Sequence, residues 1–307
     1  MRLALCQIPV SSRPSVNLRR VQEAVASAAA QRADLAVFPE ATQVRFGSDL
    51  RAAAEPLDGP FCAGLAAVAK AAGVAVVAGV FEPSSNDRVF NTAVTFDASG
   101  ERVAAYRKLH LFDAFGQSES SEVAAGSEIV TFGLADVRVG LEICYDLRFP
   151  ELSRALAVRG AELLLVPAAW AAGLFKEEHW MTLVRARAIE NTVWVAAVGQ
   201  VPDPDETTHR HLGGVGRSVL VDPFGVVRAD LGPAPGVLVA EVDPGLVSEV
   251  RRTVPSLANR REDLFGLGGV LEPTPAAPLS GRSGVSGWGT ARTGAARWSR
   301  TRCTPRQ

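Results

Sequence analysis

The sequence has little lysine and little cysteine, and each shortage restricts what the protein can be. Only three of its 307 residues are lysines, Lys70, Lys108 and Lys176, so arginine supplies nearly all the positive charge. The four cysteines are widely spaced, and none of them forms a Cys-x-x-Cys pair. This spacing argues against a zinc ribbon, an iron–sulfur site and a disulfide-stabilised scaffold.

Long apolar runs and an excess of charge are also missing. No stretch of about 18 uninterrupted apolar residues occurs, so we expect no membrane span. The first residues lack the basic start, the apolar run and the cleavage site of a signal peptide, which predicts a cytoplasmic location. The formal net charge is −1, and no basic stripe interleaved with aromatic residues is visible in the body of the chain, so we expect no nucleic-acid partner.

Positive charge is concentrated at the end of the chain. Residues 271–307 contain six arginines and one acid, Glu272, which gives them a formal charge of +5 and leaves −6 on the rest. This segment is rich in Gly, Ser, Thr, Pro and Ala and has no apolar period, so we predict a disordered basic tail. Residues 1–270 then form the predicted folded domain, which is long enough to bury a large core.

Residues 1–270 alternate between short β-branched runs and longer segments rich in Ala, Leu and Arg. The apolar spacing after Asn17 predicts a helix with this residue as its N-cap. The predicted helices cover residues 18–31, 62–72, 151–159 and 177–191. The predicted strands cover residues 3–8, 35–38, 74–80, 91–96, 102–106, 137–143, 163–167, 193–198, 219–221, 226–228 and 237–242. This mixture of crossovers and hairpins indicates one layered α/β domain with mixed sheets.

Three apolar strands end at a reactive side chain. Glu40 follows Phe38-Pro39, Lys108 follows Tyr106-Arg107, and Cys144 follows a strand that ends at Ile143. Ligands of α/β folds tend to bind at the carboxyl ends of strands. A carboxylate, an ammonium and a thiol at such a place supply a base, an electrostatic stabiliser and a nucleophile for acyl transfer.

Each of these residues also has a plain structural explanation. Cys144 fits a buried structural cysteine, Glu40 fits an exposed acid in the first turn of a helix, and Lys108 fits a chance retention of lysine. A different enzyme is also open, in which His110 or His179 serves Cys144 as a general base. His209 and His211 by themselves make a poor case for a metal site.

Several short segments together resemble the signatures of the nitrilase, or carbon–nitrogen hydrolase, superfamily. These are Phe-Pro-Glu at 38–40, Tyr-Arg-Lys-Leu-His-Leu-Phe at 106–112 and Gly-Leu-Glu-Ile-Cys-Tyr-Asp-Leu-Arg-Phe-Pro-Glu at 140–151. Their order and spacing agree with the family, and the resemblance extends over residues 1–267. It implies a Glu40–Lys108–Cys144 triad and a four-layer α–β–β–α sandwich. It also implies a homodimer or a higher homo-oligomer.

The resemblance also implies a mechanism that needs no metal and no organic cofactor. Cys144 would form a thioester with a small carboxamide substrate and release ammonia, and the backbone N–H of Tyr145 would help Lys108 to bind the oxyanion. A further acid that positions the substrate matches Glu119. The family usually follows that acid with Pro-Gly, and this chain has Ala125-Gly126 instead, which leaves Glu122 as a rival.

The Cys-Tyr-Asp-Leu-Arg-Phe-Pro-Glu form is most similar to the ω-amidase and deaminated-glutathione amidase branch, whose substrates carry a distal carboxylate. Arg45, Arg148 or Lys176 are candidates to bind that carboxylate, although Arg148 could instead pair with Glu151. Trp170 is a candidate wall of the acyl pocket or a core residue. A nitrilase, an N-carbamoyl amino acid amidohydrolase and a catalytically silent binding or assembly protein of the same fold stay open as alternatives.

Overall fold

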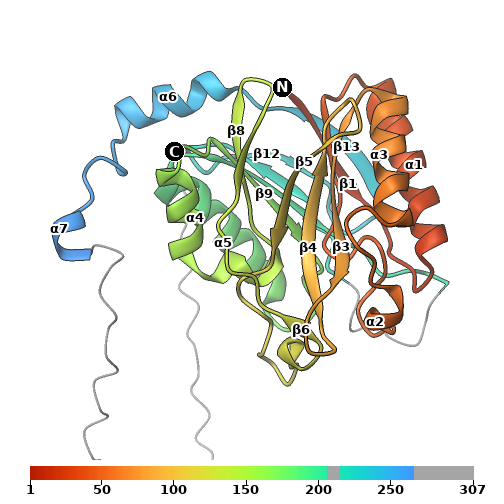
Figure 1. The fold of residues 1–307 in the computed structure, drawn as a ribbon. Coiled ribbons are helices and arrows are strands. Elements are labelled where there is room, and N and C mark those ends of the chain that lie inside the picture. Colours follow the sequence, from red (N-terminus) through yellow and green to blue (C-terminus); the bar gives the residue numbers. More distant parts are fainter. Residues whose placement is uncertain (206–213, 266–307) are drawn as a thin grey trace, which may run out of the picture. The chain divides into compact units, whose positions relative to one another are not determined.

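Two mixed β-sheets pack face to face between two pairs of helices (Figure 1). The computed structural model describes residues 1–205 and 214–265. Within Met1–Arg260 the chain forms one compact unit, and a second unit begins at Arg261. Of the described helices, none combines the length and the apolar character that a membrane crossing requires.

The first sheet has the strand order β13-β1-β2-β3-β4-β5, and β6 pairs with β4. Strand β1 is parallel to β2 and antiparallel to β13, whereas β3, β4 and β5 form an antiparallel meander. The strands of this sheet are β1 (Arg2–Gln7), β2 (Leu35–Val37), β3 (Ala75–Pro83), β4 (Val89–Phe96), β5 (Arg102–Arg107), β6 (Val123–Ala124) and β13 (Gly236–Glu241).

The second sheet has the strand order β12-β11-β10-β9-β8-β7. Strands β8, β9 and β10 are mutually parallel at its centre, and antiparallel hairpins complete both sides. Its strands are β7 (Thr131–Leu134), β8 (Val137–Leu141), β9 (Leu163–Ala168), β10 (Trp194–Gly199), β11 (Val219–Val221) and β12 (Val227–Asp230).

Helices α1 and α3 cover the outer face of the first sheet, and α4 and α5 cover the outer face of the second (Figure 1). The helices of the compact unit are α1 (Pro14–Ala30), α2 (Leu50–Ala53), α3 (Pro60–Ala72), α4 (Pro150–Val158), α5 (Lys176–Asn191) and α6 (Pro244–Thr253). Proline occupies the first turn of α1, α3, α4 and α6, where its missing N–H costs no hydrogen bond. This arrangement confirms the four-layer α–β–β–α sandwich.

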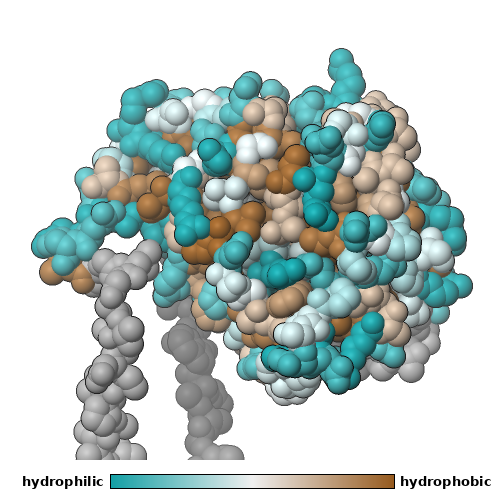
Figure 2. Space-filling view, viewed as in Figure 1, coloured by the Kyte–Doolittle hydropathy of each residue, from teal (hydrophilic) through white to brown (hydrophobic). Residues whose placement is uncertain are grey.

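Alternate residues of the strands separate the two interiors. On β1, Leu3 and Leu5 belong to the apolar cluster shared by the two sheets, whereas Ala4 and Cys6 belong to the cluster beneath α1 and α3. Successive side chains of a strand point to opposite faces, so a strand covered on both sides is apolar throughout. On the outer surface seen in Figure 2, hydrophobic residues form patches between hydrophilic ones.

Most predicted elements are found within a few residues of their expected bounds, and one expected cap is wrong. Helix α1 begins at Pro14, so Asn17 lies inside the helix and Arg13 is the residue before it. The side chain of Asn17 is fully buried and hydrogen-bonds to the backbone of Ser11 and Gln43. It therefore fastens two loops to the helix rather than capping it.

The second unit contains a short described helix, α7 (Glu262–Phe265). The predicted tail at 271–307 lies outside the described residues, so its disorder stays a prediction. His209 and His211 also lie outside them.

Candidate active site

Glu40 lies in the turn that follows β2 and is 1% exposed. The backbone N–H of Ala169, at the end of β9, donates to its Oε2 at 2.8 Å, and the side chain of Gln200 donates to its backbone carbonyl at 3.0 Å. A Cβ at Gly79 on β3 would lie 2.8 Å from the carbonyl carbon of Glu40. Glycine at this position therefore permits the close packing of the turn against β3.

Lys108 follows β5 and is held at its backbone on both sides. Its N–H donates to the carbonyl of Asn91 at 2.9 Å, and its own carbonyl accepts from the N–H of Gly126 at 2.8 Å. Its Nζ lies 2.8 Å from Oε1 of Glu40 and 2.8 Å from Oε2 of Glu119. Burial lowers the pKa of this ammonium, but Glu40 and Glu119 outweigh that effect, and the pKa stands well above its usual value. The ammonium therefore stays charged.

Cys144 begins a 3-10 helix (Cys144–Arg148) three residues after β8 ends. Its φ of 48° lies in the left-handed region, which a residue other than glycine adopts uncommonly and which often accompanies functional sites. Burial and the carboxylate of Glu40 raise the pKa of its thiol well above the usual value, although Lys108 opposes them. The resting side chain is therefore a thiol, placed beside both a carboxylate and an ammonium.

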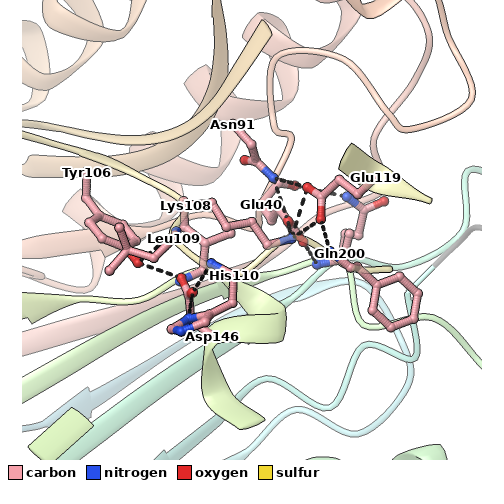
Figure 3. A network of polar contacts seen from close by, with 12 residues as sticks. Glu40, Asn91, Tyr106, Lys108, Leu109, His110, Glu119, Asp146 and Gln200 are labelled. Carbon is pink, nitrogen blue, oxygen red and sulfur yellow. Dashed lines mark hydrogen bonds and ion pairs between the residues drawn. The ribbon is translucent and has the colours of Figure 1, made fainter. Parts of the chain in front are cut away.

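Two further side chains complete the charged cluster (Figure 3). Glu119, in a 3-10 helix (Glu119–Ser121), also accepts a hydrogen bond of 2.6 Å from the N–H of Phe112. The side-chain nitrogen of Asn91 donates to Glu40 at 2.8 Å and to Glu119 at 3.1 Å. Glu119 rather than Glu122 thus contacts Lys108, while Glu122 only lines the cavity nearby.

Asp146 ties the Lys108 segment to the Cys144 segment (Figure 3). This fully buried carboxylate accepts from the hydroxyl of Tyr106 at 2.7 Å, from the N–H of His110 at 2.9 Å and from the N–H of Ile143 at 2.9 Å. The Nδ1 of His110 lies 2.8 Å from the same carboxylate. His110 is therefore held by Asp146 and stacks on Phe149, with ring centroids 3.7 Å apart.

The charged cluster lies at a cavity of about 420 Å³. Tyr145 lines this cavity from the first turn of the 3-10 helix, where a backbone N–H has no intrahelical acceptor. Trp170 lines the cavity and is also buried, at 4% exposed. Its indole N–H donates to the carbonyl of Lys176 at 2.9 Å. The other main lining side chains come from Phe46, Leu50, Phe112, Phe115 and Val123.

The cations of Arg148 and Lys176 line the same cavity. Neither has a carboxylate partner among the described residues. The Nζ of Lys176 lies 4.0 Å from the ring centre of Phe115, and the guanidinium carbon of Arg148 lies 4.8 Å from that of Trp170. Burial, with Arg148 nearby, lowers the pKa of Lys176. The expected alternative pairing of Arg148 with Glu151 is absent among the ion pairs of the described chain, and Arg45 is not one of the lining residues.

The structure brings Glu40, Lys108, Glu119 and Cys144 together, and His179 lies instead beside Arg148, at 3.4 Å. The roles of Asn91, Asp146 and Tyr106 in holding the cluster were not predicted from the sequence. The position of Asp146, two residues after Cys144, could have indicated a role for this acid. A single asparagine such as Asn91 belongs to no sequence pattern that would have indicated its role. Over the described ranges, no group of three or more His, Cys, Asp or Glu side chains is arranged to hold a metal ion.

Comparison with known proteins agrees with this geometry. The family model for carbon-nitrogen hydrolases matches residues 2–252. The chain belongs to the carbon–nitrogen hydrolase family. A hydrolase from Mycobacterium tuberculosis is 42% identical over 85% of this chain and 96% of its own length. A deaminated glutathione amidase from Escherichia coli O157:H7 is 38% identical over 85% of this chain and 97% of its own.

Solved structures of this family share the fold. An amidase from Nesterenkonia sp. AN1, with acrylamide added at its active-site cysteine, superimposes with a TM-score of 0.73 at 28% identity. The match covers 87% of this chain and 98% of that amidase. The carbon–nitrogen hydrolase fold inferred from the sequence motifs is therefore confirmed.

Proposed function

We propose that the protein hydrolyses a small carboxamide that carries an anionic group, through a thioester on Cys144. The observation that carries the proposal is the contact of Glu40, Lys108 and Cys144 at the cavity that all three line. Nothing in ligand binding alone requires a buried thiol, a carboxylate and an ammonium to meet. A catalytically silent protein of this fold is therefore the weaker explanation.

The first half of the reaction uses Glu40 as the base. Because the resting Cys144 is a thiol, its proton passes to Glu40 as Sγ attacks the carbonyl carbon. The C=O bond becomes an oxyanion, which the ammonium of Lys108 and the N–H of Tyr145 stabilise. Glu40 then returns the proton to the amide nitrogen, the C–N bond breaks, and ammonia leaves a thioester behind.

The second half of the reaction repeats these steps with water in place of the thiol. Glu40 accepts a proton from a water molecule as its oxygen attacks the thioester carbon. The C–S bond then breaks, the carboxylic acid leaves, and the proton held by Glu40 returns to the sulfur of Cys144. Glu119 positions the amide end of the substrate through the face of its carboxylate that borders the cavity. All bonds and protons balance without a metal or an organic cofactor.

Arg148 and Lys176 suggest the charge at the other end of the substrate. Two cations in a partly apolar cavity are costly unless an anion joins them. A carboxylate on the substrate supplies that anion, and bidentate or charge-assisted hydrogen bonds to it are strong. An ω-amide or a deaminated-glutathione type of amide fits this requirement, in line with the name of the E. coli relative.

An ammonia-release screen tests the function. Purified protein is incubated with ω-amides of carboxylic acids, deaminated glutathione, simple nitriles and N-carbamoyl amino acids, with Cys144→Ala as the blank. We expect release from one of the first two classes. Turnover of only nitriles or only N-carbamoyl amino acids would make the protein a nitrilase or an N-carbamoyl amino acid amidohydrolase, and inertness with every class would contradict the amidase.

Assembly, location and domain limits are further parts of the proposal. We infer a homo-oligomer that uses the outer faces of α4 and α5, where Val158 and Ile189 are exposed apolar residues. The unpaired thiols of Cys6, Cys62 and Cys144 suit the reducing cytoplasm. The catalytic domain is assigned to residues 1–270 and the remainder to a tail. Sedimentation velocity measures the oligomeric state, and a monomer at micromolar protein concentration would contradict the inferred homo-oligomer.

A further inference from the structure

Asn91 on β4 hydrogen-bonds to both carboxylates beside Lys108 and to the backbone of Lys108 itself (Figure 3). Its Nδ2 donates to Oε1 of Glu40 at 2.8 Å and to Oε1 of Glu119 at 3.1 Å. Its backbone carbonyl accepts the N–H of Lys108 at 2.9 Å. One fully buried residue thus fixes the backbone that carries the ammonium and both carboxylates that pair with it.

The orientation of this amide follows from the charges beside it. An ionised carboxylate only accepts hydrogen bonds, so the NH₂ end of Asn91 must face Glu40 and Glu119. Its Oδ1 is left buried, with no hydrogen-bond partner among the described residues. A buried acceptor without a partner is unfavourable. The contacts of the Asn91 side chain are therefore made by its donor end alone, and both go to the charged cluster.

The charge balance explains what that donor supplies. Two carboxylates lie against one ammonium, so the cluster has one negative charge more than it can neutralise. The amide of Asn91 supplies a hydrogen-bond donor to both acids without adding a charge. Asn91 does not line the cavity, so it acts on the substrate only through Glu40 and Glu119.

We propose that Asn91 is a positioning residue that holds the carboxylates of Glu40 and Glu119 aligned beside Lys108, so that Glu40 is placed to accept the proton of Cys144. The inference rests on the proposed function for its meaning in catalysis. The positioning itself can be tested without a substrate, because Glu40 adjoins the thiol of Cys144 and the reactivity of that thiol can be measured directly.

The test replaces the amide by a side chain of similar volume without a donor, Asn91→Leu. Thr95→Val is the matched control, because Thr95 is buried on the same strand and its hydroxyl has no hydrogen-bond partner among the described residues. Two pH profiles are measured for each protein, kcat/KM for ammonia release and the rate of Cys144 alkylation by iodoacetamide, mapped by peptide mass spectrometry. Thermal unfolding reports any general loss of stability.

We expect Asn91→Leu to move the acid limb of kcat/KM to higher pH by about one unit, because the cluster then takes up a proton more readily. The alkylation profile moves in the same direction, KM changes less than kcat, and Thr95→Val matches the wild type. The shift caused by Asn91→Leu should shrink in a Glu119→Gln background, where only one carboxylate remains.

The inference would be overturned if Asn91→Leu folds and shows the wild-type pH profiles of kcat/KM and of Cys144 alkylation, with only a lower unfolding temperature. Asn91 would then be a structural residue. If Asn91→Leu does not fold, the same measurements are made on Asn91→Ser, because the shorter side chain of serine does not reach either carboxylate. If the wild type releases no ammonia from any amide, the proposed function fails, and the alkylation profiles still decide the role of Asn91.

Discussion

The ammonium of Lys108 lies 2.8 Å from Oε1 of Glu40, and the two side chains are 2% and 1% exposed. Neither charge can turn to water. Lys108 therefore depends on Glu40 and Glu119 to replace its hydration. Glu40 depends on Lys108, the amide of Asn91 and the N–H of Ala169. Breaking a buried pair by removing one partner is far more damaging than breaking a surface pair. The pair therefore sets both the charge of the site and the limits on what can replace either residue.

Lys108→Arg should lower kcat/KM by at least about 100-fold, although it keeps the charge. The planar guanidinium needs more room than the ammonium and cannot present a point charge at the same place. Lys70→Arg is the matched control, because Lys70 is exposed on α3. Steady-state ammonia release measures both. Near-normal kcat/KM in Lys108→Arg would show that the position tolerates any cation.

His110→Gln separates this mechanism from a Cys–His hydrolase. Since His110 is bound to Asp146 and stacked on Phe149, we expect its loss to lower kcat by no more than about tenfold, through poorer positioning. Loss of a general base would cost about 100- to 10,000-fold. His179→Gln is measured in parallel. A loss in the larger range for either variant would favour the histidine mechanism.

The sequence predicted much of this architecture, because its strongest signals are periodic. Strands covered on both faces are continuous apolar runs, and α3 ends where predicted, at Ala72, with Gly73 in the left-handed conformation after it. The motifs of Glu40 and Cys144 were visible because each follows a largely buried strand, whereas Lys108 follows β5, which is partly exposed. Short elements such as α2, β6 and β7 went unnoticed, since four residues or fewer carry no period.

What the sequence did not show depends on contacts between distant segments. Asn91 meets Glu40 across 51 positions of sequence, and Asp146 meets Tyr106 across 40. No local pattern encodes such a pair. The placement of Arg148 and Lys176 on one wall likewise needed the fold, because they come from different helices.

Glu142 predicts a pH dependence of stability. Burial raises its pKa to about 8, the nearby Ser153 hydroxyl offsets only part of that rise, and neither carboxyl oxygen has a hydrogen-bond partner among the described residues. Between its ordinary pKa of 4.5 and about pH 8, the folded protein holds a proton that the unfolded chain releases. The unfolding free energy should therefore fall as pH rises through this range, by up to about 1.4 kcal/mol per unit from this group.

Glu142→Gln should remove that decline and make the protein more stable than the wild type above pH 8. Urea denaturation across the pH range measures the difference. Glu249→Gln, an exposed change on α6, is the matched control. Parallel curves for wild type and Glu142→Gln would mean that the carboxyl is already ionised in the folded protein.

Lys176→Met should separate anionic from neutral substrates. Loss of the cation should raise KM for an amide with a distal carboxylate by about tenfold or more and leave KM for a neutral amide of similar length almost unchanged. Lys70→Met serves as the control. Equal changes in KM for both amides would assign Lys176 to packing against Phe115 rather than to charge recognition.

Deletion of residues 271–307 should leave ammonia release intact. The family match ends at residue 252, and every described residue that lines the cavity precedes this segment. The truncated chain is compared with the full chain for kcat/KM and for unfolding temperature. A large loss of kcat/KM would assign the segment a part in catalysis.

The most direct test of the account is to isolate the covalent intermediate. An amide that the screen identifies as a substrate is mixed with the enzyme, and the reaction is quenched in acid within milliseconds. The protein is then digested, and the mass of the peptide that contains Cys144 is measured by mass spectrometry. We predict an added mass equal to the substrate minus ammonia on Cys144, and none in Cys144→Ala, which should also release no ammonia. Rapid ammonia release with no adduct on Cys144, or full activity in Cys144→Ala, would contradict the mechanism.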